Sequence, residues 1–164
     1  MSIIDELLRN NAAYAARFSG PLPLPPARRL VVVACMDARI DIFRVLGLDD
    51  GDAHILRNAG GVVTEDVIRS LAISQRLADT REIVLIHHTD CGMLMLSEEE
   101  FTAAIEAETG IRPSWTAEAF GDLEQDVRQS IARIKASPFI PHKDSVRGFV
   151  FDVATGRLGE VAEK

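Results

Sequence analysis

Two cysteines and a histidine follow two short aliphatic runs of the chain. Cys35 comes after the run at residues 30–33, and His88 and Cys91 end or follow the run at residues 82–88. A histidine and a cysteine with two residues between them can converge on one tetrahedral ion. Two thiolates and one imidazole favour zinc over magnesium or calcium. These residues therefore predict a zinc site, and three protein ligands leave a fourth position open for chemistry.

A carboxylate and a guanidinium accompany the first of these cysteines. Asp37 and Arg39 follow Cys35 at alternate positions, so their side chains point the same way along an extended chain. In open parallel sheets, ligands bind beyond the carboxyl ends of the strands. We therefore expect these residues to share one crevice with His88 and Cys91. A disulfide between the two cysteines is the alternative, but it would leave the other three side chains without a common purpose.

The elements that must position these residues alternate between strand and helix. A strand at residues 30–33, a helix at 64–78 and a strand at 82–88 should form a right-handed, parallel βαβ unit. Further strands are expected at residues 53–56, 146–153 and 158–161, and further helices at 2–18, 40–46, 97–109 and 120–136. The predicted fold is an α/β domain with a mostly parallel central sheet flanked by helices.

The first 26 residues differ from the rest of the chain. Residues 2–18 have helical apolar spacing, and the proline-rich residues 21–26 cannot continue a helix. We interpret residues 1–164 as a single domain, in which residues 1–26 form an N-terminal helix and spacer and residues 27–164 form the catalytic core. A helix held away from its own core by a stiff spacer predicts packing on a second subunit, and hence a homodimer.

Composition and charge exclude several classes of partner. The formal net charge is -7, whereas nucleic acids and anionic membranes require clustered positive charge. No apolar run approaches the roughly 20 residues of a membrane helix. Residues 1–10 carry Asp5 and Glu6 within their apolar pattern, unlike a secretory signal. We expect a cytoplasmic protein that binds neither nucleic acid nor membrane.

Four further polar side chains near these segments have simpler interpretations. His87 should point to the face of its strand opposite His88 and lie in the core or an interface. His54 is expected to be partly buried and hydrogen-bonded, and His142 to lie at the surface. Asp90 is expected to form an Asx turn, with a proton relay as the alternative.

Three motifs together resemble the β-class carbonic anhydrases, and most closely a short actinobacterial, mycobacterial-type branch. They are CMDAR at residues 35–39, RNAGG at residues 57–61 and HTDCG at residues 88–92. The resemblance spans residues 31–156. It implies an α/β fold, an obligate dimer that can extend to a higher oligomer, and an enzyme that hydrates CO2 to bicarbonate with zinc-bound hydroxide.

The resemblance also implies roles for individual residues. Cys35, His88 and Cys91 would hold Zn2+, while Asp37 and Arg39 would form the catalytic dyad. In some members of the family the aspartate binds the zinc and closes the site, and in the open form it pairs with the arginine. Hydrolysis of carbonyl sulfide or carbon disulfide on the same fold is an alternative function, and a zinc-binding protein without turnover is a third.

Overall fold

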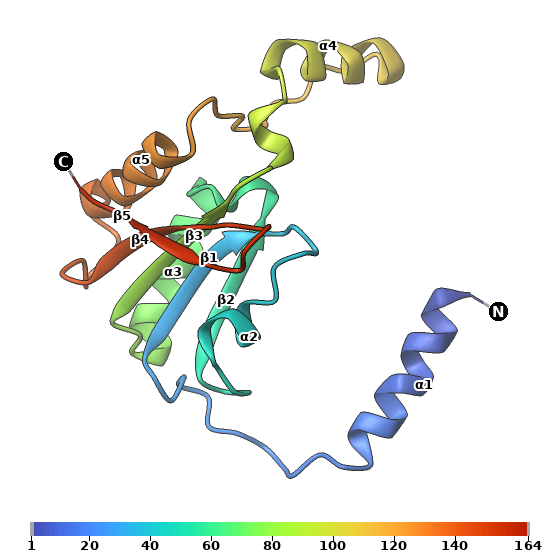
Figure 1. Ribbon diagram of the computed structural model, residues 1–164, viewed down its shortest axis with the longest axis vertical. Helices are drawn as coiled ribbons and strands as arrows, with labels where there is room; N and C mark the ends of the chain where they lie inside the picture. Colours follow the sequence, from blue (N-terminus) through green and yellow to red (C-terminus); the bar gives the residue numbers. More distant parts are fainter. Residues whose placement is uncertain (1, 164) are drawn as a thin grey trace.

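A five-stranded sheet forms the centre of the computed structural model, which describes residues 2–163 (Figure 1). The strands are β1 (Leu30–Cys35), β2 (Ala53–Asn58), β3 (Glu82–His88), β4 (Val146–Phe151) and β5 (Leu158–Val161). Their order across the sheet is β2-β1-β3-β4-β5. The first four are parallel, and β5 pairs antiparallel with β4. The prediction of a mostly parallel sheet is therefore confirmed.

Strands β1 and β3 are neighbours, and their register brings their carboxyl ends together. Val33 pairs with Leu85 and Ala34 with Ile86, so Cys35 and His88 end adjacent strands at the same edge of the sheet. Both strands are almost completely buried, as continuous aliphatic runs in a parallel sheet require. The polar side chains that follow these two separate segments of the chain are thus brought to the same edge of the sheet.

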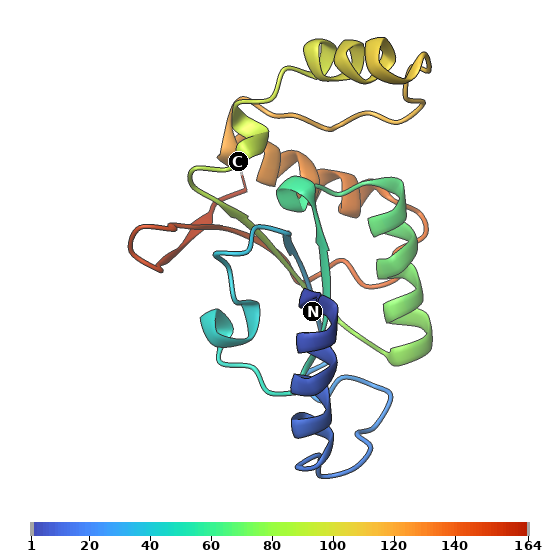
Figure 2. The same cartoon turned by 90° about the vertical axis from the view of Figure 1, so that its right-hand side faces the viewer.

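Helices cover both faces of the sheet. Helices α3 (Glu65–Ala78) and α5 (Leu123–Ala136) pack on one face, and the short helix α2 (Ile42–Leu46) lies on the other (Figure 2). The core of the first face includes Val31, Leu85 and Ile131. The second face includes Val32 and Ile86 together with both cysteines. The thiols of Cys35 and Cys91 therefore lie at the margin of a hydrophobic core that holds their backbone in place.

The ends of several helices agree with the sequence analysis, because their capping residues are recognisable. Thr64 caps α3 by accepting a hydrogen bond from the backbone of Val67, and Ser97 caps α4 (Glu98–Thr109) in the same way. The predicted start of α5 near residue 120 was wrong by three residues. Asp122 accepts a hydrogen bond from the backbone N–H of Gln125 and fixes the start at Leu123.

Helix α1 (Ile3–Ala15) stands away from the sheet, and residues 16–29 connect it to β1 (Figure 1). Ser2 and Asp5 form a capping box at its start. None of its residues is buried, and Ile3, Ile4, Leu7 and Leu8 are each more than half exposed. Within residues 2–163, no helix combines the length and apolarity needed to cross a bilayer.

Candidate active site

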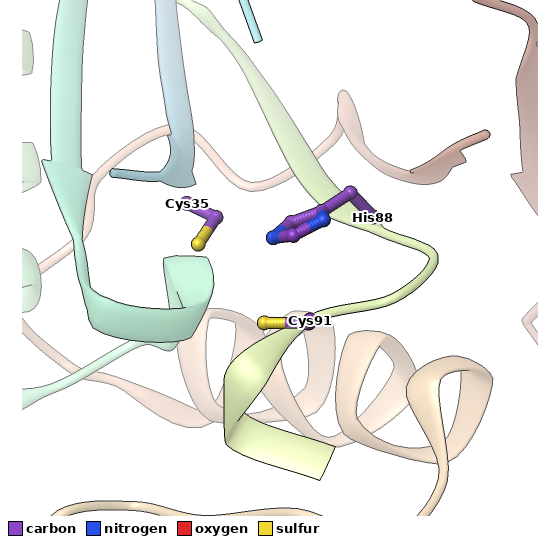
Figure 3. A group of neighbouring side chains, drawn as sticks. All are labelled: Cys35, His88 and Cys91. Carbon is purple, nitrogen blue, oxygen red and sulfur yellow. The ribbon is translucent and has the colours of Figure 1, made fainter. Parts of the chain in front are cut away.

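The donor atoms of Cys35, His88 and Cys91 converge on one point beyond the ends of β1 and β3 (Figure 3). These atoms all lie within 4.8 Å of one another. Cys35 is the last residue of β1, His88 is the last residue of β3, and Cys91 precedes the short 3-10 helix η2 (Gly92–Leu94). All three side chains are buried. The structure thus brings together the three residues that the sequence predicts as metal ligands.

The cluster offers two thiol sulfurs and one imidazole nitrogen, which are the donor atoms that a soft metal ion prefers. Both cysteines are free thiols, so the alternative of a disulfide is not observed. The Nδ1 atom of His88 lies 2.8 Å from the carbonyl oxygen of Thr89. A carbonyl can only accept, so Nδ1 carries the proton and Nε2 carries the lone pair. Within the described residues, that buried Nε2 has no hydrogen-bond partner. A buried nitrogen lone pair that faces two thiols fits a metal ion as its partner.

Burial also makes the thiols dependent on a cation. It raises the pKa of the Cys91 thiol to about 11, and the neighbouring Cys35 and Asp37 act in the same direction. The backbone N–H of Met93 opposes this shift by donating to the sulfur. A thiolate at Cys91 is therefore unfavourable at neutral pH unless a metal ion compensates its charge. The donor set fits zinc, which is bound by neutral imidazole and thiolate.

Asp37 lies beside this cluster but is held by Arg39. Its Oδ1 accepts from the backbone N–H and the Nε of Arg39 at 2.8 and 2.9 Å, and its Oδ2 accepts from Nη2 at 2.8 Å. These hydrogen bonds hold the pKa of the Asp37 carboxyl well below its usual range. The same Oδ2 is 3.7 Å from Nε2 of His88. The carboxylate is therefore ionised, oriented and within reach of the metal position.

Arg39 also binds Asp90, which the sequence analysis did not anticipate. Its Nη1 donates to the Asp90 carboxylate at 2.7 Å, and its Nη2 donates to the Asp90 carbonyl at 2.9 Å. Asp90 has a positive φ of 54°, as expected of a turn residue. One guanidinium thus joins the loop after β1 to the loop after β3. The contact spans 51 residues of sequence, and no local pattern signals it.

The glycines of the second motif let the chain approach the site closely. Gly60 and Gly61 lie in the 3-10 helix η1 (Ala59–Gly61) with φ of 83° and 71°. A Cβ atom on Gly61 would lie 2.7 Å from the backbone nitrogen of Cys35, closer than real Cβ contacts. Only glycine at position 61 therefore permits this close approach of the two backbones.

A small cavity of about 160 Å3 opens onto the candidate ligands. Its lining consists of Cys35, Met36, Asp37, Ala59, Gly60, His88, Cys91, Gly92 and Met93. The cavity is mostly apolar apart from the three candidate ligands and Asp37. It suits a small, weakly polar substrate.

The other histidines lie outside this cavity. His87 points to the opposite face, where its Nε2 lies 2.6 Å from the carboxylate of Asp126 on α5, so the prediction of a core histidine is confirmed. His54 is partly buried and lies 2.8 Å from the hydroxyl of Ser74. His142 is half-buried and contacts Arg81 through Nδ1 at 3.2 Å. Its side chain is thus less free than the sequence suggested.

Comparison with known proteins identifies the family. A family model described as carbonic anhydrase matches residues 30–158. The chain is 59% identical over 161 residues to Beta-carbonic anhydrase 1 of Mycobacterium tuberculosis, an alignment that covers 98% of this chain and 99% of that protein. The chain therefore belongs to the β class of the carbonic anhydrase family, as its three motifs indicate.

Solved structures and a further relative show how far the fold is shared. The carbonic anhydrase of Streptococcus mutans superposes with a TM-score of 0.92 at 44% identity, and each chain covers 99% of the other. A carbon disulfide hydrolase of Acidithiobacillus thiooxidans is 37% identical over an alignment of 156 residues that covers 82% of this chain and 78% of that protein. The same fold thus occurs in proteins named for two different reactions.

Proposed function

We propose that this chain catalyses the reversible hydration of CO2 to bicarbonate at a zinc ion held by Cys35, His88 and Cys91. The observation that carries the proposal is the buried Nε2 of His88, which has no hydrogen-bond partner among residues 2–163 and faces two free thiols. Asp37, already ionised and held by Arg39, lies directly beside them. Family membership supplies the reaction that this arrangement would perform.

Each residue of the site has a role that its contacts support. When bound, zinc lowers the pKa of a coordinated water and so supplies a nucleophile near neutral pH. The carbonyl of Thr89 fixes the tautomer of His88 and directs Nε2 at the metal position. Asp37 can accept the proton of the attacking water in a hydrogen bond and orient its lone pair toward the carbon of CO2. Arg39 keeps that carboxylate charged and away from the metal position.

The reaction consumes water and CO2 and releases bicarbonate and a proton. One C–O bond forms, and the second bond of one C=O group of CO2 becomes a lone pair on oxygen. The small, mostly apolar cavity accommodates a linear molecule without charge. The bicarbonate anion is better solvated by water than by this cavity, which favours its release. No further cofactor is needed for this balance.

The substrate is tested by comparing linear electrophiles on one preparation. Initial rates of the zinc-loaded protein should be high with CO2 and much lower with carbonyl sulfide and carbon disulfide. The whole-length identity with a β-carbonic anhydrase favours CO2, whereas the relative named for carbon disulfide is less similar. Faster turnover of carbon disulfide than of CO2 would replace the proposal with the alternative. Zinc binding without turnover of any of the three would favour a non-catalytic zinc protein.

We also propose that the working unit is a homodimer in which α1 packs on the partner. Such dimers can assemble further into a higher oligomer. The support is the exposed apolar face of α1, formed by Ile3, Ile4, Leu7 and Leu8. Such a surface is unusual on a monomer. CO2 and bicarbonate are then the small-molecule partners, and the cytoplasmic location stays a prediction.

A further inference from the structure

The arginine of the second motif, Arg57, has no role in the chemistry described so far. It lies on β2, where its backbone pairs with Ala34 of β1. Its Nε donates to the carbonyl oxygen of Cys35 at 2.9 Å, and its Nη2 donates to the carbonyl oxygen of Asp37 at 2.7 Å. One guanidinium therefore spans the backbone from a candidate metal ligand to the catalytic carboxylate.

The segment that Arg57 spans lies where the pairing of β1 with β2 stops. The strand pairing of β1 with β2 ends at Cys35, and the Met36 side chain is 65% exposed, so it adds little packing. The backbone N–H of Met36 donates to the Asn58 carbonyl at 2.8 Å, and the Asp37 carbonyl also accepts from the backbone of Ile40 at 3.1 Å. Arg57 adds a side-chain donor to the carbonyl of Cys35, the last residue of the strand, and a second donor to the carbonyl of Asp37 just beyond it.

We infer that Arg57 is a positioning residue that sets the distance and orientation between Cys35 and Asp37. A guanidinium is planar and presents its donors in a fixed fork, so the two carbonyls that it binds are held in a fixed relation. Fixing these carbonyls fixes the backbone from which the thiol and the carboxylate extend. This inference rests on the proposed function, because it takes Cys35 as a metal ligand. Arg57 does not line the cavity, so it acts through these two residues.

A purely structural role and a positioning role predict different behaviour. A structural arginine would affect the melting temperature of the metal-free and metal-loaded protein alike. A positioning arginine would affect the geometry at the metal and the rate at which the metal leaves. Outer partners of metal ligands typically change metal affinity or activity by about 10- to 100-fold when they are lost.

The experiment compares Arg57→Ala and Arg57→Lys with Arg76→Ala in the full-length protein. Arg76 is the matched control, because its Nη2 also donates to a backbone carbonyl, that of Phe139, at 3.1 Å. Zinc release into excess chelator is measured well below each melting temperature. The absorption spectrum of the cobalt-substituted protein reports ligand geometry, and CO2 hydration gives kcat and KM.

We expect Arg57→Ala to release zinc about 10- to 100-fold faster than the wild type, with an altered cobalt spectrum and a lower kcat at nearly unchanged KM. Arg57→Lys should restore these properties only in part, since an ammonium lacks the fork. Arg76→Ala should match the wild type. Equal zinc release and equal cobalt spectra in Arg57→Ala and Arg76→Ala would overturn the inference, as would full rescue by lysine.

Two further outcomes keep the inference separate from the proposed function. If Arg57→Ala does not fold, the folded Arg57→Lys variant decides: faster zinc release supports the positioning role, and wild-type release overturns it. The zinc content of the wild type is measured first. A wild-type protein that binds no zinc would refute the proposed site itself, whereas a zinc-loaded protein with unaffected Arg57 variants would refute only the positioning role.

Discussion

At the scale of single residues, Arg39 fixes the position and orientation of the Asp37 carboxylate. The guanidinium binds that carboxylate through both of its oxygens and binds Asp90 at the same time. Asp90 thereby anchors Arg39 to the loop that carries His88 and Cys91. Because Asp37 stands close to the candidate ligands, the same carboxylate could bind either Arg39 or a metal ion. The arginine favours the first state.

We predict that Arg39→Ala keeps its zinc but loses activity, by about 10- to 100-fold. Without its partner the pKa of Asp37 rises toward its usual value near 3.8, so the carboxylate is still ionised at neutral pH. It is then free to compete with hydroxide for the metal. Hydroxide becomes more abundant as pH rises, so the remaining activity should appear at more alkaline pH.

The control for this variant is Arg44→Ala, because Arg44 forms an exposed ion pair with Asp41 on α2 and does not line the cavity. Its rates should equal those of the wild type. The measurement is the pH dependence of kcat/KM together with zinc content. A wild-type pH profile in Arg39→Ala would make Arg39 a structural ion pair without a catalytic role.

At the scale of elements, the close contact of η1 with the end of β1 supports the site. Gly61→Ala should destabilise the protein, because its φ of 71° disfavours any side chain and a Cβ atom would meet the backbone of Cys35 at 2.7 Å. The conformation alone costs roughly 1–2 kcal/mol. The steric conflict adds about 1–3 kcal/mol.

The matched control is Gly156→Ala, which has nearly the same φ of 72° but no atom within 4 Å of an added Cβ. Urea unfolding should show the smaller loss for Gly156→Ala. Zinc content should fall only in Gly61→Ala, because only there is the backbone of a candidate ligand displaced. Equal losses of stability and unchanged zinc content in both variants would show that η1 does not hold the ligand in place.

Much of this arrangement is predictable from local sequence, and the exceptions have physical causes. The strand ending at His88 is delimited by a buried aliphatic run, and the helix after Thr64 by its cap. The predicted start of α5 was too early because Phe120 extends the helical spacing of apolar residues toward the N-terminus. The side chain of Asp122 instead caps the helix, which begins at Leu123. Contacts between loops, such as Arg39 with Asp90, depend on the folded sheet and have no local signal.

At the scale of the whole molecule, α1 is the part that the described chain leaves without a packed face. Its apolar residues remain exposed although the helix is well capped. Tyr14 donates to the Asp50 carboxylate at 3.3 Å and ties the end of the helix to the core. The helix is thus attached to the rest of the chain while its apolar face stays exposed, as the proposed dimer requires.

We predict that the double variant Leu7→Glu, Leu8→Glu sediments as a monomer or aggregates. Burial of each leucine contributes about 1.5–3 kcal/mol, and a buried unpaired carboxylate would oppose association further. The control variant Asn10→Glu, Asn11→Glu adds the same charge at polar positions of the same helix and should leave the dimer intact. Sedimentation velocity at micromolar concentration separates these results, and a monomeric wild type would contradict the proposed dimer.

The central claim is that Cys35, His88 and Cys91 hold the metal at which CO2 is hydrated. X-ray absorption at the zinc edge of the purified protein tests it most directly. The account predicts two sulfur neighbours at about 2.3 Å and a histidine nitrogen at about 2.0–2.1 Å, with one sulfur lost if Cys91→Ser retains any zinc. A zinc ion without sulfur neighbours, or full CO2 hydration by protein freed of all metal, would contradict the account.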